Sequence, residues 1–346
     1  MNLKRTLASL AGAVLAALIA GCGAVTPITA GTPTPAPTIT PGVSSEYSPT
    51  TASSVPAGVV SGPDGGLWFT ESAANQIGRL SSTATFLEFG ATGSTISANA
   101  KPTSITVGSD AALWFAESGL PQIGRCSTSG LIKEYVLTNP LATPAQIVAG
   151  GDGALWVTDP GTNAVWRVDT SGNATFSTLL TGASGVSGIT AGPDGALWVT
   201  ETSVDKIAKL VISAPGTSPA ATVTEYPVTA GSGPATIRTG SDGALWFTES
   251  KSGKIGRMLT TGVLSSETAL TGMTAPTGMA LGQDGNFYIS DPGKSVIGQY
   301  VPASGKTTLF PTITASAGPT WVTLGPDNEI YFTENTISKI GQFKYF

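Results

Sequence analysis

The chain has no histidine among its 346 residues and only two cysteines. Histidine titrates closest to neutrality and is the commonest metal ligand, so its absence excludes Ser-His-Asp triads, imidazole general bases and histidine-ligated zinc. A disulfide framework is excluded as well, because Cys22 has another expected fate, given below, and Cys126 would then lack a partner.

Charged residues are scarce, at 11% of the chain, and the net charge is −5, or −7 once Lys4 and Arg5 are removed with the segment described next. Nucleic-acid binding needs a basic footprint, so we expect no nucleic-acid partner. Helical apolar periodicity is absent after residue 22. The 44 glycines and the short apolar runs between them indicate an all-β protein.

The N-terminal residues resemble a targeting signal followed by a tether. A basic start, an apolar run and the ending Gly21-Cys22 are typical of a secretory signal, and the ending resembles the bacterial lipoprotein signal, in which the cysteine is lipidated. We expect a signal peptide over residues 1–21, lipidation of Cys22, a Thr/Pro-rich extended tether over residues 22–43, and an extracytoplasmic, membrane-anchored protein. An uncleaved membrane anchor is the alternative.

The rest of the chain repeats one unit, seen as GPDGALWVTE at residues 192–201. Its seven copies are anchored at Asp64, Asp110, Asp152, Asp194, Asp242, Asp284 and Asp327. Seven residues after each aspartate comes a carboxylate: Glu71, Glu117, Asp159, Glu201, Glu249, Asp291 and Glu334. Eight residues further on comes a polar or basic residue: Arg79, Arg125, Arg167, Lys209, Arg257, Gln299 and Gln342.

Successive aspartates are 42 to 48 residues apart, and each copy holds several short strands, which is typical of propeller blades. We therefore predict an all-β, seven-bladed β-propeller over residues 44–346, and expect a monomer. The seventh copy ends without an outer strand, whereas residues 44–48 match the outer strand at residues 224–227. We predict that the N-terminal segment completes the last blade and closes the ring.

Two inserts interrupt the period, at residues 91–101 and 211–221. Inserts on a rigid scaffold often carry binding, and neutral drift is the alternative.

The repeated block GPDGALW, with KIGR at residues 254–257 and TEYP at residues 224–227, resembles the virginiamycin B lyase (streptogramin lyase) family over roughly residues 44–346. The resemblance implies a seven-bladed propeller. It also implies an elimination that opens the ring of type B streptogramins, with a magnesium ion, histidines at the starts of inner strands, and a glutamate two residues before one of them.

The positions that match the histidine are Ala57, Thr103, Ala145, Ser187, Ala235, Thr277 and Thr320. Those that match the glutamate are Val55, Lys101, Thr143, Gly185, Gly233, Ala275 and Gly318. An elimination needs a base and an acid or metal, and these side chains supply none of them. We expect the fold without the family's reaction or cofactor, and therefore expect neither catalytic residues nor metal ligands.

Departures from the repeat point to a candidate ligand site. Arg238 is the only charge in one inner-strand column, Trp321 and Gln146 stand out in the next, and Lys101 lies near the same end of the channel. A bidentate arginine and a tryptophan ring would suit an anionic or carbohydrate ligand. Packing of the channel, with Arg238 solvated by water, is the alternative.

The strand-end carboxylates allow a functional interpretation, a Ca²⁺- or Mg²⁺-binding ring. In the structural interpretation each acid caps its own loop or pairs with a lysine or arginine. Sevenfold repetition favours the structural one. We also expect the tryptophans of the repeat to pack between blades, and Cys126 to be a buried core residue.

Three functions stay open. The first is a lipid-anchored, non-catalytic propeller that binds a small molecule, glycan or protein at its central mouth. The second is an enzyme, such as a carbon–oxygen lyase, that uses residues other than histidine. The third is an architectural surface protein.

Overall fold

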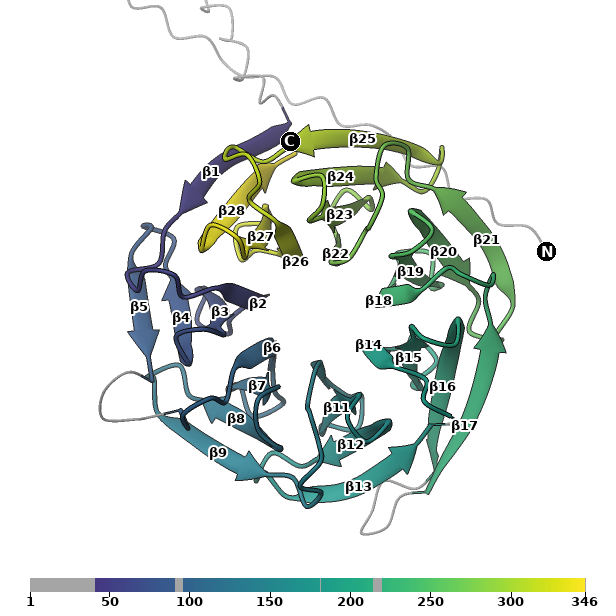
Figure 1. The fold of residues 1–346 in the computed structure, drawn as a ribbon, viewed down its shortest axis with the longest axis horizontal. Helices are drawn as coiled ribbons and strands as arrows, with labels where there is room; N and C mark the ends of the chain where they lie inside the picture. Colours follow the sequence, from purple (N-terminus) through teal and green to yellow (C-terminus); the bar gives the residue numbers. More distant parts are fainter. Residues whose placement is uncertain (1–40, 91–95, 181, 214–219, 346) are drawn as a thin grey trace, which may run out of the picture. The chain divides into compact units, whose positions relative to one another are not determined.

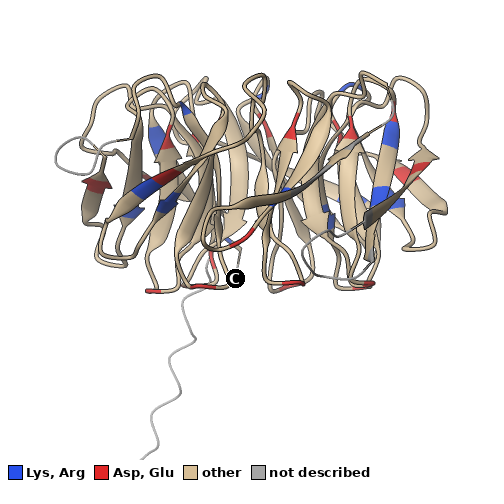
Figure 2. Cartoon of the chain, turned by 90° about the horizontal axis from the view of Figure 1, so that it is seen from below, with Lys and Arg blue, Asp and Glu red and all other residues tan. Residues whose placement is uncertain are grey.

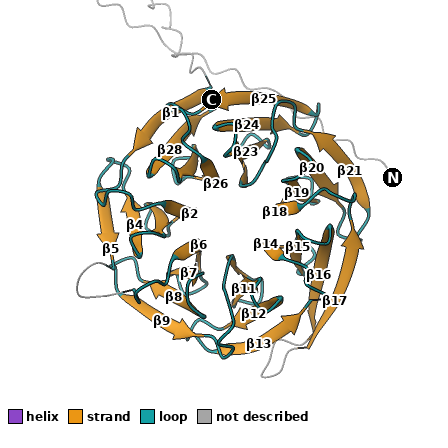
Figure 3. Cartoon of the chain, in the orientation of Figure 1, coloured by secondary structure: helices purple, strands orange, loops and turns teal. Residues whose placement is uncertain are grey.

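The structure, a computed structural model, describes residues 41–90, 96–180, 182–213 and 220–345. In these residues 28 strands form seven four-stranded antiparallel sheets arranged around one axis (Figure 1). Figure 3 shows the same ring coloured by secondary structure, with strands and loops only. This is the predicted seven-bladed β-propeller. The expected signal peptide, Cys22 and the tether up to residue 40 lie outside the described residues.

Each blade has four strands in sequence order, except that the last is completed from the N-terminus. The inner strands are β2 (Pro56–Ser61), β6 (Pro102–Val107), β10 (Ile147–Ala149), β14 (Val186–Ala191), β18 (Pro234–Thr239), β22 (Met279–Leu281) and β26 (Pro319–Leu324). The second strands are β3 (Leu67–Glu71), β7 (Leu113–Glu117), β11 (Leu155–Asp159), β15 (Leu197–Glu201), β19 (Leu245–Glu249), β23 (Phe287–Asp291) and β27 (Ile330–Glu334).

The third strands are β4 (Gln76–Leu80), β8 (Gln122–Cys126), β12 (Ala164–Val168), β16 (Lys206–Ser213), β20 (Lys254–Met258), β24 (Val296–Val301) and β28 (Lys339–Lys344). The outer strands are β5 (Phe86–Phe89), β9 (Ile132–Val136), β13 (Ala174–Leu179), β17 (Ala220–Pro227), β21 (Leu264–Ala269), β25 (Lys306–Pro311) and β1 (Gly42–Tyr47).

The core lies between blades, because every residue of each second strand is buried. Trp68 of blade 1, for example, packs with Ile105, Leu113 and Phe115 of blade 2. The expected inter-blade role of the repeated tryptophans is confirmed. Glycine is required at residue 78 of the third strand of blade 1, since a Cβ on Gly78 would lie 2.1 Å from the ring of Phe69.

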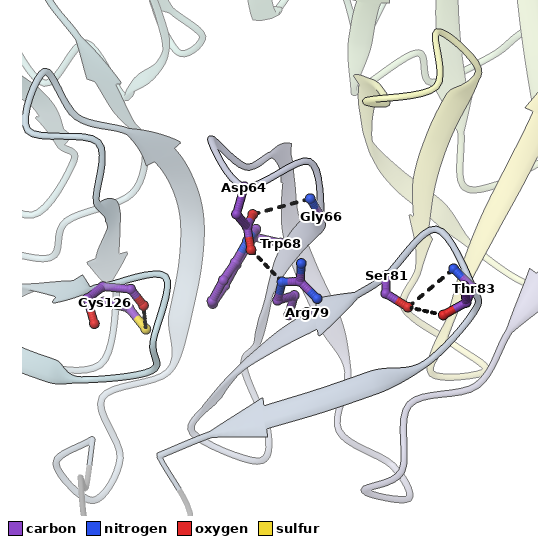
Figure 4. Close-up of polar contacts among 8 residues, drawn as sticks. Asp64, Gly66, Trp68, Arg79, Ser81, Thr83 and Cys126 are labelled. Carbon is purple, nitrogen blue, oxygen red and sulfur yellow. Dashed lines mark hydrogen bonds and ion pairs between the residues drawn. The ribbon is translucent and has the colours of Figure 1, made fainter.

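The fixed spacing of the repeat comes from one set of contacts, shown for blade 1 in Figure 4. Asp64 Oδ1 accepts hydrogen bonds from Trp68 Nε1 at 2.9 Å and the Gly66 amide at 3.2 Å, and Oδ2 accepts from Arg79 Nε at 2.6 Å. The partner 15 residues after the aspartate recurs in every blade: Arg125, Arg167, Lys209, Arg257, Gln299 and Gln342. In Figure 2 acidic residues line the edge of the propeller where these turns lie.

Neighbouring blades are also joined by hydroxyl groups near the axis. Thr70 Oγ1 accepts from the Gly58 amide at 2.8 Å in its own blade and donates to the Thr103 carbonyl of the next blade at 2.6 Å. The same link closes the ring, where Thr333 Oγ1 donates to the Ala57 carbonyl at 2.9 Å. These bonds fix the relative position of the inner strands.

The ring is closed as predicted, by β1 pairing antiparallel with β28. The register runs from Gly42 opposite Lys344 to Tyr47 opposite Ile340. Because β1 begins at Gly42, the last two residues of the expected tether, residues 42–43, belong to the propeller sheet.

The two inserts differ in form. Much of the insert at 211–221 lengthens a hairpin, since β16 and β17 stay paired out to Ser213 opposite Ala220, and residues 214–219 lie outside the described part. Of the insert at 91–101, residues 96–101 are described, and there Ile96 is buried.

Candidate functional site

A cavity of about 430 Å³ lies on the axis and is lined by residues of all seven inner strands. The column predicted from the repeat lines it completely: Val60, Thr106, Val148, Thr190, Arg238, Ala280 and Thr323. These residues lie in the middle or second half of their strands. The cavity is therefore displaced from the end at which the inner strands begin, toward the aspartate turns.

Arg238 and Trp321 meet in this cavity although their strands, β18 and β26, belong to blades 5 and 7. The guanidinium carbon lies 6.0 Å from the centre of the Trp321 ring. Blade 6 between them places only Gly278 and Ala280 at the corresponding positions. These small residues leave room for the contact across the channel.

The Arg238 guanidinium has no carboxylate partner in the described part of the chain. Its one hydrogen bond runs from Nη1 to the carbonyl of Ile237, at 2.9 Å. Burial lowers the pKa of Arg238 to about 10, so the side chain stays cationic at neutral pH. The cavity thus contains a half-buried positive charge without a counter-charge.

Gln146 also lines the cavity, and its side-chain oxygen accepts a bond of 3.4 Å from the Ile189 amide. The Gln146 amide nitrogen and the Trp321 indole nitrogen make no hydrogen bond to any described residue, so both donors are available. Lys101 lies elsewhere: it is exposed, precedes β6, and is not among the lining residues. The structure therefore brings three of the four predicted residues together.

The strand-end carboxylates behave in two ways. Asp159 and Asp291 cap loops as the structural interpretation expected: Asp159 accepts from the Thr143 and Gly161 amides, and Asp291 from the Thr274 and Ala275 amides. That interpretation is wrong for Glu71, Glu117, Glu201 and Glu334, whereas Glu249, alone of the five glutamates, accepts a bond from its own loop, from the Ser252 hydroxyl. All five are fully buried, and the longer side chain carries the carboxyl past the loop amides that an aspartate reaches.

Cys126 is fully buried in the core beside Trp68, as expected. Burial raises the pKa of its thiol to about 12, so the reactive thiolate does not form near neutrality. In the described part of the chain no helix is long and apolar enough to cross a membrane.

The architecture defines a seven-bladed β-propeller, and among the described residues the cation in its axial cavity, Arg238, has no ion-pair partner. The sequence matches the virginiamycin B lyase family over residues 36–216 and 215–345, and the chain belongs to that family. No curated protein sequence matches this chain.

Solved structures agree with this family. A streptogramin B lyase is 29% identical over 87% of this chain and 96% of its own, with a TM-score of 0.79. Virginiamycin B lyase from Staphylococcus aureus is 29% identical over 87% of this chain and 99% of its own, also with a TM-score of 0.79. Hydrazine synthase from Kuenenia stuttgartiensis, 15% identical over 86% and 97% with a TM-score of 0.64, shares the fold alone.

The positions that match the family's histidine have a structural role here. The carbonyl of each accepts a hydroxyl hydrogen bond that links two blades: Ala57, Thr103, Ala145, Ser187, Ala235, Thr277 and Thr320. The positions that match the glutamate hold no carboxylate, and the described residues contain no group of three acids or cysteines able to hold a metal. The side chains present do not fit the family's magnesium ion.

Sequence reasoning missed one feature, the partner of each strand-end glutamate. The signal was present: the five copies with a glutamate at the strand end also have a glutamate in the outer strand, and the two copies with aspartate do not.

Proposed function

We propose that this protein is a non-catalytic binding propeller, held outside the cytoplasm by a lipid on Cys22, that binds a small organic anion in its axial cavity. The observation that carries the proposal is the Arg238 guanidinium, which lines the cavity, lies over the Trp321 ring and has no described carboxylate partner. A desolvated charge without a partner costs folding free energy. A ligand carboxylate or phosphate supplies the missing counter-charge in bidentate geometry.

The lining indicates the rest of the ligand. Val60, Val148 and Leu281 are apolar, and the Trp321 ring offers a face for a planar group. The free donors on Gln146 and Trp321 suit acceptor oxygens beside the anionic group. A volume of about 430 Å³ accommodates a small molecule rather than a polymer.

The absence of catalysis is supported by the family itself. A structural relative of this chain is described as a catalytically inactive histidine-to-alanine variant of the S. aureus enzyme with quinupristin. This chain has no histidine at any position. This chain therefore has no counterpart of the histidine whose replacement is described as inactivating that enzyme.

Binding is tested with benzoate and its neutral analogue benzamide, by tryptophan fluorescence and calorimetry. We expect saturable binding of benzoate, with benzamide weaker by about tenfold because it lacks the charge. Arg238→Gln is expected to weaken benzoate binding by about 10- to 100-fold. Lys101→Gln, a matched removal of a charge outside the cavity, is expected to leave it unchanged. Equal affinity of wild type and Arg238→Gln, or no saturable binding of benzoate, would contradict the proposal.

Catalysis is tested separately, with quinupristin and magnesium, by mass spectrometry and chromatography. We expect the substrate to stay intact. Ring opening that depends on the folded propeller would establish the alternative, a lyase that uses residues other than histidine.

The lipid anchor is tested by fractionation of cells that make the full chain. Cys22→Ser is expected to move the protein from the membrane to the soluble fraction, because a lipid chain provides the attachment. The matched variant Cys126→Ser is expected to stay with the membrane. Membrane retention of Cys22→Ser would instead favour the uncleaved anchor.

A further inference from the structure

Five blades contain a buried carboxyl group that no ordinary donor satisfies. Both side-chain oxygens of Glu71, Glu117, Glu201 and Glu334, and Oε1 of Glu249, are buried and accept no hydrogen bond. Only Glu249 Oε2 has a donor, the Ser252 hydroxyl at 2.6 Å. Ser54 faces Glu71, Gln122 faces Glu117 and Ser184 faces Glu201, but none of the three meets hydrogen-bond geometry with its carboxyl. As carboxylates, these groups would be buried charges without partners, which proteins avoid.

A second glutamate lies beside each of them. It comes from the outer strand, opposite the third residue of the third strand: Glu88 opposite Gly78, Glu134 opposite Gly124, Glu225 opposite Ala208, Glu267 opposite Gly256 and Glu46 opposite Gly341. The third-strand residue opposite the outer glutamate is glycine or alanine, and the ring of a second-strand phenylalanine packs over the glycine, as Phe69 does over Gly78. In each of these blades the outer glutamate faces the strand-end glutamate closely enough to interact with it electrostatically, as Glu134 does with Glu117 and Glu267 with Glu249.

The two remaining blades lack this arrangement entirely. Their strand-end acids are Asp159 and Asp291, and the matching outer positions hold Ser177 and Leu309. Both aspartates accept amide hydrogen bonds and are satisfied as carboxylates. The two glutamates thus occur together or not at all across seven copies of one unit, which indicates that they act as a pair.

Four of the five outer glutamates are held as carboxylates by the loop that leads into their own blade, and the fifth, Glu225, is paired with Lys206. Glu88 accepts from the Thr50 amide at 2.6 Å, the Thr51 amide at 3.0 Å and the Thr51 hydroxyl at 2.6 Å. Although burial raises the pKa of Glu88, these bonds bring it below its ordinary value. The corresponding loop donors in three other blades are Ser97 for Glu134, Thr229 for Glu267 and Thr314 for Glu46.

We propose that each of these five blades contains a buried proton-binding site, in which the protonated strand-end glutamate donates a hydrogen bond to the outer-strand carboxylate. The proton satisfies both groups at once: it neutralises the inner carboxyl and gives the outer carboxylate another donor. The outer carboxylate in turn holds the loop that connects the blade to the preceding one. Proton binding is thereby coupled to the anchoring of the connecting loops.

The charged neighbours differ between blades. The first residue of the third strand is glutamine in blades 1 and 2, Gln76 and Gln122, so there the outer glutamate is the only charge that faces the site. In blades 4, 5 and 7 it is a lysine, Lys206, Lys254 or Lys339, which faces both carboxyls. Lys206 and Lys339 pair with the outer glutamate at 2.5 and 2.6 Å. Alanine or valine stands at this position in blades 3 and 6.

Burial, assisted by the neighbouring glutamate, favours the protonated form of each strand-end glutamate. It raises the pKa of Glu71 and Glu249 to about 7 and that of Glu117 and Glu334 to about 8, and it raises the pKa of Glu201 as well. Loss of the proton leaves a buried carboxylate facing a half-buried one, and their repulsion weakens the hold on the connecting loop.

The test is the number of protons released on unfolding. Wild-type protein is unfolded with urea in weakly buffered solution near pH 7, and release is read with an indicator dye. We expect net release, because the unfolded glutamates ionise. Glu117→Gln keeps the shape and a donor toward Glu134, so we expect about one proton fewer and stability retained at about pH 9. Asp159→Asn is the control: it should leave proton release unchanged and lower stability at every pH.

Glu71→Gln provides a second variant should Glu117→Gln fail to fold. The infrared carbonyl band of protonated carboxylic acids, read on wild-type protein at neutral pH, requires no variant. Unchanged proton release in both glutamine variants would overturn the proposal. So would the absence of the infrared band, or stabilisation by added Ca²⁺ at neutral pH, which would indicate a cation between the carboxylates instead.

Discussion

Arg238 lies over the ring of Trp321 from two blades away, and the contact spans the axial cavity. The blade between them contributes only the small side chain of Ala280 to the same column, which also contains Val60 and Val148. An arginine in an otherwise uncharged column, with no described carboxylate partner, is costly to the fold. A binding function would explain an arginine at a position where it lowers the stability of the fold.

Replacement of Arg238 should accordingly stabilise the protein. Arg238→Met removes the desolvated charge and keeps an apolar body against Trp321, so we expect the free energy of unfolding to rise by about 1 kcal/mol. Urea denaturation measures it. Arg257→Met is the control: Arg257 pairs with Asp242 at 2.7 Å and lies 5.7 Å from the Trp246 ring centre, so its loss should destabilise. A destabilised Arg238→Met would mean that the arginine is a packing element.

The aspartate of each turn should be a main determinant of blade stability. Asp64→Ala removes bonds from Trp68, Gly66 and Arg79, and we expect a loss of about 2–4 kcal/mol in the free energy of unfolding. Asp64→Asn, which retains an acceptor for Trp68, should lose less. Equal losses for the two variants in urea denaturation would contradict a role for the Trp68 bond.

The pH dependence of that variant has a definite sign. Although burial raises the pKa of Asp64, its hydrogen bonds hold the pKa below the ordinary 3.8. The group therefore contributes stability above its unfolded pKa, and this is lost as the pH falls through the lower folded pKa. Asp64→Asn should reduce the fall in stability on acidification, measured by thermal melting below about pH 4.

The paired glutamates give stability the opposite dependence on pH. Since the folded pKa of Glu249 is about 7, above its ordinary 4.5, its contribution is fully present below the unfolded pKa and is lost as the pH rises through about 7. Lys254→Gln removes the cation that faces this pair and makes blade 5 resemble blades 1 and 2. We expect the variant to release more protons on unfolding at about pH 8.

Lys251→Gln is the matched control for that experiment. Lys251 is exposed and its ammonium group contacts the Thr202 carbonyl at 3.2 Å, so we expect no change in proton release. Equal release from Lys254→Gln and wild type would show that the lysine does not set the proton affinity of the pair.

Removal of β1 should open the ring. Deletion of residues 1–48 exposes the edge of β28 and removes Glu46, which binds Lys339 and Thr314, so we expect a large loss of stability and self-association through the free edge. Deletion of residues 1–40 retains β1 and should leave a stable species of one size in light scattering. Two deletions of equal stability would contradict closure by the N-terminal strand.

The sequence by itself determined the architecture of this protein, because its repeat has a local cause. The aspartate, the tryptophan four residues later and the base 15 residues later all belong to one blade. Their contacts therefore require a fixed spacing between these residues in the sequence. Ring closure could also be predicted, because the outer strand that the seventh copy lacks is present at the N-terminus.

The cavity and the paired carboxyls were decided only by the tertiary structure. Arg238 and Trp321 are 83 positions apart and meet because seven inner strands converge on one axis. Whether a strand-end acid is paired depends on the length of its side chain. The Asp159 carboxylate ends beside the loop amides, whereas the Glu117 carboxyl lies one methylene beyond them. Such differences in reach are set by three-dimensional packing; the sequence shows that the two glutamates occur in the same five copies, but not that their carboxyls face each other.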